Sequence, residues 1–253
     1  MDISDRKLPR KVNEVVLGSP PNIFCVSVNY RNCFYVVYDR GLGTYSLEDP
    51  HAPELLHSID SEQLEFHASD DRFRIPNRIS LFEDKLICHV PHNVMIFDLV
   101  DPENPAMISA RTIVDRDSGH NYNDDKAGIC AIAFSEGHLY CSSRGGLTVY
   151  RLEMLPSGRY DLKEVGKRSA TPLEQLAMRW PRGLFRHQDL LIENAGPFGV
   201  LAYDITDPTR PRRKYHATTS RWVQKVGLYR QMLYTLSGPQ GGPELNLFEI
   251  PDK

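Results

Sequence analysis

Three stretches repeat one phrase and decide the fold: Tyr45-Ser-Leu-Glu-Asp-Pro50, Phe97-Asp-Leu-Val-Asp-Pro102 and Tyr203-Asp-Ile-Thr-Asp-Pro208. A less regular copy occurs at Tyr150-Arg-Leu-Glu-Met-Leu-Pro156, and a shorter copy occurs at Phe248-Glu-Ile-Pro-Asp252. The aromatic residues that open the five copies are 52, 53, 53 and 45 residues apart. Such regular spacing predicts a repeat architecture.

A second sequence feature recurs at nearly the same spacing. Polar pairs suited to a tight turn each precede a short apolar run, at Arg31-Asn32, Glu83-Asp84, Glu136-Gly137, His187-Gln188 and Arg230-Gln231. Short β-rich runs between turn residues are typical of strands. The pattern of one repeat therefore predicts a strand, a tight turn, a second strand, a loop, a third strand, an Asp-Pro turn and a fourth strand. Each opening aromatic residue is expected in the core, because it shares a strand face with the aliphatic residue two positions later.

Four-stranded units at this period are typical of propeller blades. We predict an all-β fold, a five-bladed β-propeller of four-stranded antiparallel blades forming a single domain. The blades are expected at about 22–60, 73–113, 128–167, 180–219 and 221–253. The fifth blade lacks a fourth strand, and residues 9–18 match the pattern of one, so this N-terminal strand is predicted to close the ring. A solenoid is the alternative, but solenoids need capping ends, whereas the two ends here complement each other.

Helical periodicity is scarce. Residues 171–178 are the one predicted helical turn, with Thr171 as the N-cap and Pro172 at the first helical position.

Two segments resemble LVIVD-type propeller repeats. Residues 94–98 read Val-Met-Ile-Phe-Asp and precede Asp101-Pro102, and residues 200–204 read Val-Leu-Ala-Tyr-Asp and precede Asp207-Pro208. Weaker copies stand at 147–151 and 43–46. The resemblance covers most of the chain and rests on scaffold residues. It implies a propeller with a binding or scaffolding role, often extracellular, and no catalytic chemistry. The Gly-His and Trp-Asp signature of WD40 repeats is absent.

The charge and composition of the chain exclude some classes of binding partner. The net charge is -3, the charged residues are mixed along the chain, and no apolar run approaches the length of a spanning helix. We therefore expect neither a nucleic-acid partner nor a membrane. The N-terminus shows no export signal, which favours the cytoplasm. The five cysteines lack metal-ligand spacing, so buried free thiols are expected. Cys130 and Cys141 flank one turn and could instead face each other across a hairpin.

A binding face is predicted where the first, innermost strand of each blade begins; we call it the funnel face. Three long inter-blade connections gather there, and long loops on a rigid scaffold tend to carry function. The strand starts are cationic and aromatic, and arginine and tryptophan are enriched at binding hot spots. The candidate ligand- or partner-binding residues are Arg78, Trp180, Arg182, Trp222, Lys225, His120, Asn123 and Arg144. The alternative is that the tryptophans pack between blades and the arginines are solvated or paired.

Catalytic signatures are scarce. The predicted inner strands carry no Asp or Glu, which a five-bladed glycosidase would need. No nucleophile elbow, phosphate loop, haem motif or zinc spacing occurs, so no cofactor is expected. Residues 115–125 are rich in oxygen ligands, but the glycine falls one place early for a calcium loop and no glutamate closes it.

Three functions remain open. The sequence favours a non-enzymatic interaction module, or scaffold, that presents the funnel face to a protein or peptide. One alternative is a binder of a small anionic or sugar ligand in the central funnel. Another is a hydrolase that uses loop carboxylates or histidines, for which His120 and Asp124 would have to lie close together.

Overall fold

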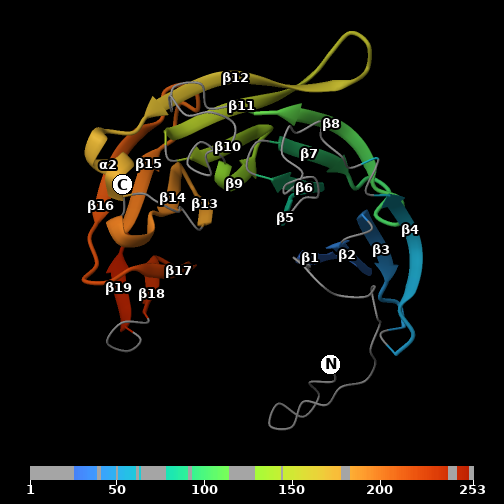
Figure 1. Ribbon diagram of the computed structural model, residues 1–253, viewed down its shortest axis with the longest axis horizontal. Coiled ribbons are helices and arrows are strands. Elements are labelled where there is room, and N and C mark those ends of the chain that lie inside the picture. The colour runs from blue at the N-terminus through green and yellow to red at the C-terminus, as the bar shows by residue number, and fades with distance from the viewer. Residues whose placement is uncertain are drawn as a thin grey trace. The chain divides into compact units, whose positions relative to one another are not determined.

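The protein is described from a computed structural model. The structure describes residues 26–38, 41–49, 51–60, 63, 78–90, 93–113, 129–143, 145–177, 183–238 and 244–250. Their contacts group them into two compact units that divide between Thr112 and Ile113 (Figure 1). Nearly all regular structure in these residues is antiparallel β-sheet, as the repeat predicts. No helix among them is long and apolar enough to cross a membrane.

The first unit holds two four-stranded sheets whose strands follow chain order. The first sheet contains β1 (Val26–Tyr30), β2 (Cys33–Tyr38), β3 (Gly41–Ser46) and β4 (Glu54–Asp60). The second contains β5 (Arg78–Phe82), β6 (Lys85–Val90), β7 (Asn93–Asp98) and β8 (Ala106–Thr112). The inner strands β1 and β5 lie side by side.

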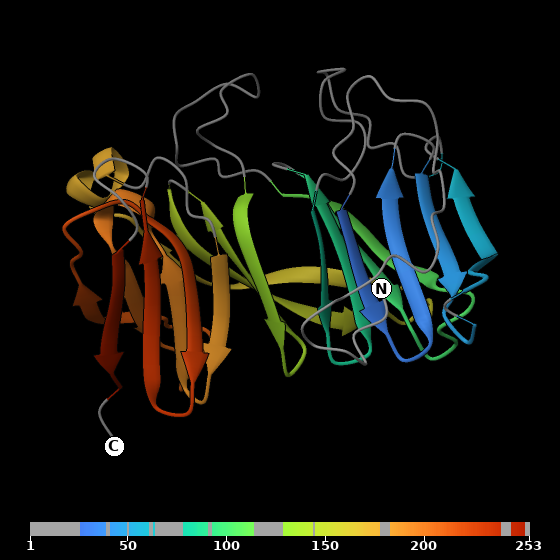
Figure 2. The same ribbon diagram turned by 90° about the horizontal axis from the view of Figure 1, so that it is seen from below.

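The second unit holds three sheets, again in chain order (Figure 2). The third sheet contains β9 (Ile129–Ser135), β10 (His138–Ser143), β11 (Gly146–Met154) and β12 (Tyr160–Ser169). The fourth contains β13 (Gly183–His187), β14 (Leu190–Asn194), β15 (Val200–Asp204) and β16 (Arg212–Ala217). The fifth has three strands, β17 (Val223–Tyr229), β18 (Met232–Ser237) and β19 (Glu244–Glu249). Two short helices, α2 (Pro172–Ala177) and η3 (Gly196–Phe198), lie beside each other.

The tight turns that join the first two strands of each sheet share one backbone conformation. Their leading residues all have positive φ, between 50° and 56°, at Arg31, Glu83, Glu136, Gln188 and Arg230. Two-residue hairpins need this left-handed conformation because it matches the twist of the strands. In the fourth sheet, the turn predicted at His187-Gln188 is wrong by one residue. The turn there is Gln188-Asp189, because His187 is still paired with Leu190 as the last strand residue.

The aspartates of the repeated phrase form the turns that the sequence predicts. Their Oδ1 atoms accept hydrogen bonds from the backbone two residues on: Asp49 from His51 at 2.8 Å, and Asp207 from Thr209 at 2.9 Å. Asp101 does the same with Glu103 at 3.1 Å. Each such bond mimics a backbone turn and fixes the connection between the third and fourth strands.

The aromatic residues that open the phrase are largely core residues, which confirms their predicted role. Phe97, Tyr150 and Tyr203 are buried, and Tyr45 and Phe248 are half-buried. In all four four-stranded sheets the pairing of the third and fourth strands shifts at this residue, between Thr44 and Tyr45 in the first sheet and at equivalent places in the others. The repeated phrase therefore marks a β-bulge, which bends a strand and strengthens its twist.

Cys33, Cys88 and Cys141 are buried free thiols, as expected, and burial raises the pKa of the Cys141 thiol. Cys141 does not face Cys130 across the hairpin, because its partner on β9 is Ile132. Residues 9–18, predicted to close the ring, lie outside the described residues.

Candidate functional site

Three of the eight candidate binding residues lie among the described residues: Arg78, Trp222 and Lys225. Arg78 belongs to the first unit, and Trp222 and Lys225 belong to the second. Their convergence on one face therefore stays a prediction. The other five lie outside the described residues: Trp180, Arg182, His120, Asn123 and Arg144.

Arg78 begins β5 and is exposed. Directly opposite it on β6 lies His89, which is buried and has no hydrogen-bond partner among the described residues on either ring nitrogen. Burial, with the added repulsion of the Arg78 guanidinium, lowers the pKa of His89 to about 3. The imidazole is therefore neutral at physiological pH and places no second charge beside Arg78.

Trp222 and Lys225 stand at the start of β17 in the second unit. Trp222 leaves 37% of its surface exposed, although its carbonyl accepts a hydrogen bond from the Gly238 amide at 3.4 Å. It is therefore not sealed within its own unit. Lys225 is exposed, and among the described residues it forms no ion pair. Beside them, Glu244 accepts a hydrogen bond from Ser220 at 2.7 Å and lies 3.6 Å from the Arg221 guanidinium.

A buried polar cluster lies at the seam between the third and fourth sheets, and the sequence analysis did not identify it. Glu193 of β14 is almost completely buried. Its Oε1 accepts a hydrogen bond from Ser142 of β10, and its Oε2 accepts one from the hydroxyl of Tyr203 of β15 at 2.5 Å. The Arg168 guanidinium stands over the Tyr203 ring, 5.4 Å from its centre. Burial raises the pKa of Glu193, although the hydrogen bonds from Ser142 and Tyr203 oppose it.

The repeat itself contains a signal for this cluster. Counted from the left-handed turn residue, the position of Glu193 is filled in the other sheets by uncharged residues: Val36, Cys88, Cys141 and Thr235. A carboxylate at a core position of one repeat indicates a polar contact there, since buried carboxylates are almost always paired. The partner Ser142 lies 51 residues earlier, so sequence spacing alone does not reveal it.

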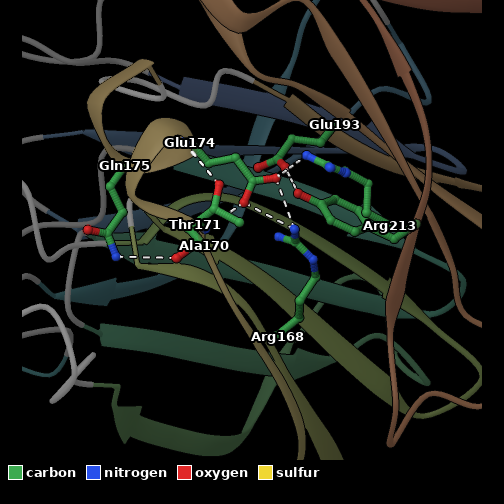
Figure 3. Close-up of polar contacts among 8 residues, drawn as sticks. Arg168, Ala170, Thr171, Glu174, Gln175, Glu193 and Arg213 are labelled. Atoms are coloured by element: carbon green, nitrogen blue, oxygen red, sulfur yellow. Dashed lines mark hydrogen bonds and ion pairs between the residues drawn. The ribbon is translucent and has the colours of Figure 1, made fainter.

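A second carboxylate, Glu174, belongs to helix α2 (Figure 3). Thr171, the predicted N-cap, forms a capping box with Glu174, which the sequence analysis had not named. The Glu174 amide donates to Thr171 Oγ1 at 3.3 Å, and the Thr171 amide donates to Glu174 Oε2 at 2.7 Å. Burial alone would raise the pKa of Glu174, but hydrogen bonds from Thr171 and Arg168 outweigh it and lower that pKa.

The described inner strands offer little for catalysis. As predicted, β1, β5, β9, β13 and β17 carry no Asp or Glu, and their one histidine, His187, ends β13 at the opposite edge from the funnel face. Within the described part of the chain, no group of His, Cys, Asp or Glu is arranged to hold a metal ion. A site built from these residues alone can bind a ligand through aromatic and cationic contacts.

Comparison with other proteins identifies the fold. The sequence matches no protein-family model and no curated protein. Its structure is similar to a protein from Bacteroides fragilis provisionally assigned as a 6-phosphogluconolactonase, with TM-score 0.63 and 9% identity over 88% of this chain and 66% of that one. It is also similar to the periplasmic gluconolactonase PpgL of Pseudomonas aeruginosa, with TM-score 0.59 and 13% identity over 89% and 70%.

A computationally designed protein, Ika8, is similar as well, with TM-score 0.59 and 10% identity over 90% of this chain and 58% of that one. The chain thus spans less than two thirds of the length of Ika8 and of the Bacteroides protein. At such low identity these likenesses define the fold alone: the chain is a β-propeller, and its five sheets are the blades.

Proposed function

We propose that this propeller binds a small anionic, sugar-derived ligand at the funnel face. The observation that carries the proposal is the pair at the start of β17, where the partly exposed Trp222 stands three residues from Lys225, an exposed cation that forms no ion pair with the described residues. Ligand sites combine an apolar or aromatic wall with a few placed polar groups. An indole can cover the apolar face of a sugar, and an ammonium can bind its carboxylate or phosphate.

The comparisons support this ligand class. The two natural proteins of similar structure reported above carry names that refer to gluconolactone or its 6-phosphate. Ring opening of such a lactone gives a polyhydroxy acid, which combines hydroxyl groups with a negative charge. Arg78, Trp180 and Arg182 would extend the same chemistry if they converge with Trp222 and Lys225.

Hydrolysis of a sugar lactone is the second candidate, favoured by the same names. Because the described inner strands lack carboxylates, the acid and base would have to come from other segments, such as the loop with His120 and Asp124. A third candidate function is binding of an acidic peptide at the funnel face, and it stays a prediction.

Calorimetric titration with gluconate and 6-phosphogluconate tests the proposal. We expect Trp222→Ala and Lys225→Ala each to weaken binding about tenfold, which corresponds to about 1.4 kcal/mol. Added salt should weaken binding of the wild type more than binding of Lys225→Ala, because screening acts on the charge. Lys163→Ala, which removes an exposed lysine from β12, is the matched control and should bind normally.

The outcomes separate the candidate functions. Binding of the acids without turnover of the lactones supports a binding protein, and turnover supports the hydrolase. If the wild type binds neither acid at millimolar concentration, the proposal is wrong and the peptide interpretation takes its place.

A further inference from the structure

The last strand of the fourth sheet, β16, is exposed along nearly its whole length (Figure 1). Arg212 to His216 are all exposed, and only Ala217 is half-buried. The strand pairs with β15 alone, and no other backbone hydrogen bond joins it to the rest of the described chain. An edge strand directs about half of its N–H and C=O groups away from the sheet. β16 therefore offers unpaired backbone groups to another strand.

The charge of β16 sets it apart from the outer strands of the other sheets. It carries three cations and no acid. In contrast, β4 carries two acids and neither lysine nor arginine, and β8 carries a single arginine. In β12, two acids offset two of the three cations. Because the other repeats form their outer strands without such a charge, the fold does not require it.

Neighbouring acids neutralise this charge only in part. Arg213 is engaged with Glu174 of helix α2, since its Nη1 donates to Oε1 at 2.8 Å. Lys214 lies 3.9 Å from Asp204, and the two side chains are 37% and 38% exposed. Arg212 forms no ion pair with the described residues. Arg212 and Lys214 therefore keep positive charge available to a partner.

The nearest acids along the chain are used by the turn between β15 and β16. Asp204 Oδ1 accepts hydrogen bonds from the amide and the hydroxyl of Thr206, at 3.0 and 2.7 Å. Asp207 Oδ1 accepts the same pair from Thr209, at 2.9 and 2.7 Å. These carboxylates fix the turn rather than the cations of the strand.

The available cations share one face of the sheet. Arg212 is the cross-strand partner of Asp204, and Lys214 approaches the same aspartate. Lys214 Nζ also lies 5.5 Å from the centre of the Tyr215 ring, which is 40% exposed. Side chains of a strand alternate between the two faces, so a strand added beside β16 would meet these cations with every second residue.

We propose that β16 is a docking edge for an extended acidic peptide segment of another protein. The segment adds to the fourth sheet beside β16, so that its backbone pairs with the free edge and its alternate carboxylates meet Arg212 and Lys214. The same cations discourage pairing with an apolar strand or with β16 of a second copy, since like charges repel. A nucleic acid would match the charge but not the unpaired backbone groups, which favours a peptide.

Binding of a short labelled peptide in which glutamate alternates with valine, followed by fluorescence anisotropy, tests the proposal. We expect the wild type to bind it and the double variant Arg212→Ala/Lys214→Ala to bind about tenfold more weakly. Arg159→Ala/Lys163→Ala removes two exposed cations near the β11–β12 turn and is the matched control, which should bind normally. Arg212→Lys keeps the charge and should also bind normally.

Two further measurements separate strand pairing from attraction by charge alone. A peptide methylated at every backbone nitrogen keeps its carboxylates but cannot donate to a strand edge, so it should bind about tenfold more weakly or worse. The unmodified peptide should also slow hydrogen exchange of the β16 amides that face the free edge.

Three outcomes would overturn the proposal. The first is no binding of the peptide to the wild type at millimolar concentration. The second is equal binding of the methylated peptide or of heparin without slower exchange in β16, which would identify a general polyanion surface. The third is equal weakening in the control variant. Gluconate binding should be the same in Arg212→Ala/Lys214→Ala as in the wild type, so this surface and the proposed ligand site are tested separately.

Discussion

Glu193 occupies a position that the other four repeats fill with uncharged side chains, and the difference changes the chemistry of one seam. Both of its oxygens accept hydrogen bonds from hydroxyl groups, and no cation bonds to it directly in the described part of the chain. An ionised carboxylate is costly in such surroundings. The seam between the third and fourth sheets therefore contains a group whose charge state affects stability.

Glu193→Gln should make the protein less sensitive to pH. Because burial raises the pKa of Glu193, the folded protein binds more protons than the unfolded chain between the ordinary and the raised value. The free energy of unfolding of the wild type should therefore fall as pH rises through that window, by about 1.4 kcal/mol for each unit of separation. Urea denaturation between about pH 4 and pH 8 measures this slope.

Glutamine carries no charge, so the variant should lack this slope and gain stability over the wild type as pH rises. Glu174 contributes the opposite slope at lower pH, since its pKa is lowered, and both proteins share it. Parallel pH profiles for the two proteins would contradict the expectation.

Tyr203→Ala should cost about 3–5 kcal/mol, as for other aromatic truncations in a core. The ring is buried, and its hydroxyl also donates to Glu193, so the change leaves both a cavity and a carboxylate with one donor fewer. Tyr203→Phe removes only the hydroxyl and should cost less. Denaturant midpoints give both values, and a loss near zero for Tyr203→Ala would show that the aromatic anchor is not a core residue.

At the level of single elements, the sequence predicted strands and turns well because their signals are local. Helix α2 was predicted because Thr171 suits an N-cap and Pro172 suits the first helical position, and both signals lie within one turn. Gln188 was assigned to the wrong place in its turn, since His187 and Gln188 are equally polar and only the pairing of His187 with Leu190 separates them. The β-bulge at each aromatic anchor was missed, because a shift in pairing involves a partner strand that spacing does not show.

The fifth sheet supports a prediction about its missing strand. Among the described residues, β19 pairs only with β18, so one edge is free. An apolar cavity of about 250 Å³ lies beside it, lined by side chains of the fourth and fifth sheets that include Ile192, Ala202, Leu233 and Phe248. We propose that residues 9–18 form the fourth strand here and cover this cavity.

Removal of residues 1–19 should therefore expose an apolar strand edge and cause aggregation. Removal of residues 1–8 alone is the control and should leave the protein soluble. Soluble yield and the melting temperature compare the two, and a peptide of residues 9–18 should restore the shorter protein. A 1–19 deletion as soluble and heat-stable as the parent would refute the strand assignment.

For the whole molecule, the fold was predictable because the same signals recur five times, so errors within one repeat do not affect the count. The candidate site was predictable only in part. Trp222 and Lys225 were proposed as binding residues because they stand at strand starts, and the Glu193 and Glu174 clusters were missed because they depend on contacts between separate elements. Arg168, Glu174 and Arg213 come from three separate elements, and nothing in their spacing of 6 and 39 residues predicts that they meet.

The consecutive order of strands within each sheet has a consequence for biosynthesis. Every hydrogen-bonded strand pair described here joins neighbours in the chain, so each sheet can form as soon as its own residues leave the ribosome. The proposed pairing of residues 9–18 with β19 is the exception. That segment is made before all five sheets, whereas its partner strand β19 is made after their other strands. A nascent chain would then carry this segment unpaired while the five sheets form, and chaperones that recognise unpaired strands could bind it during that time.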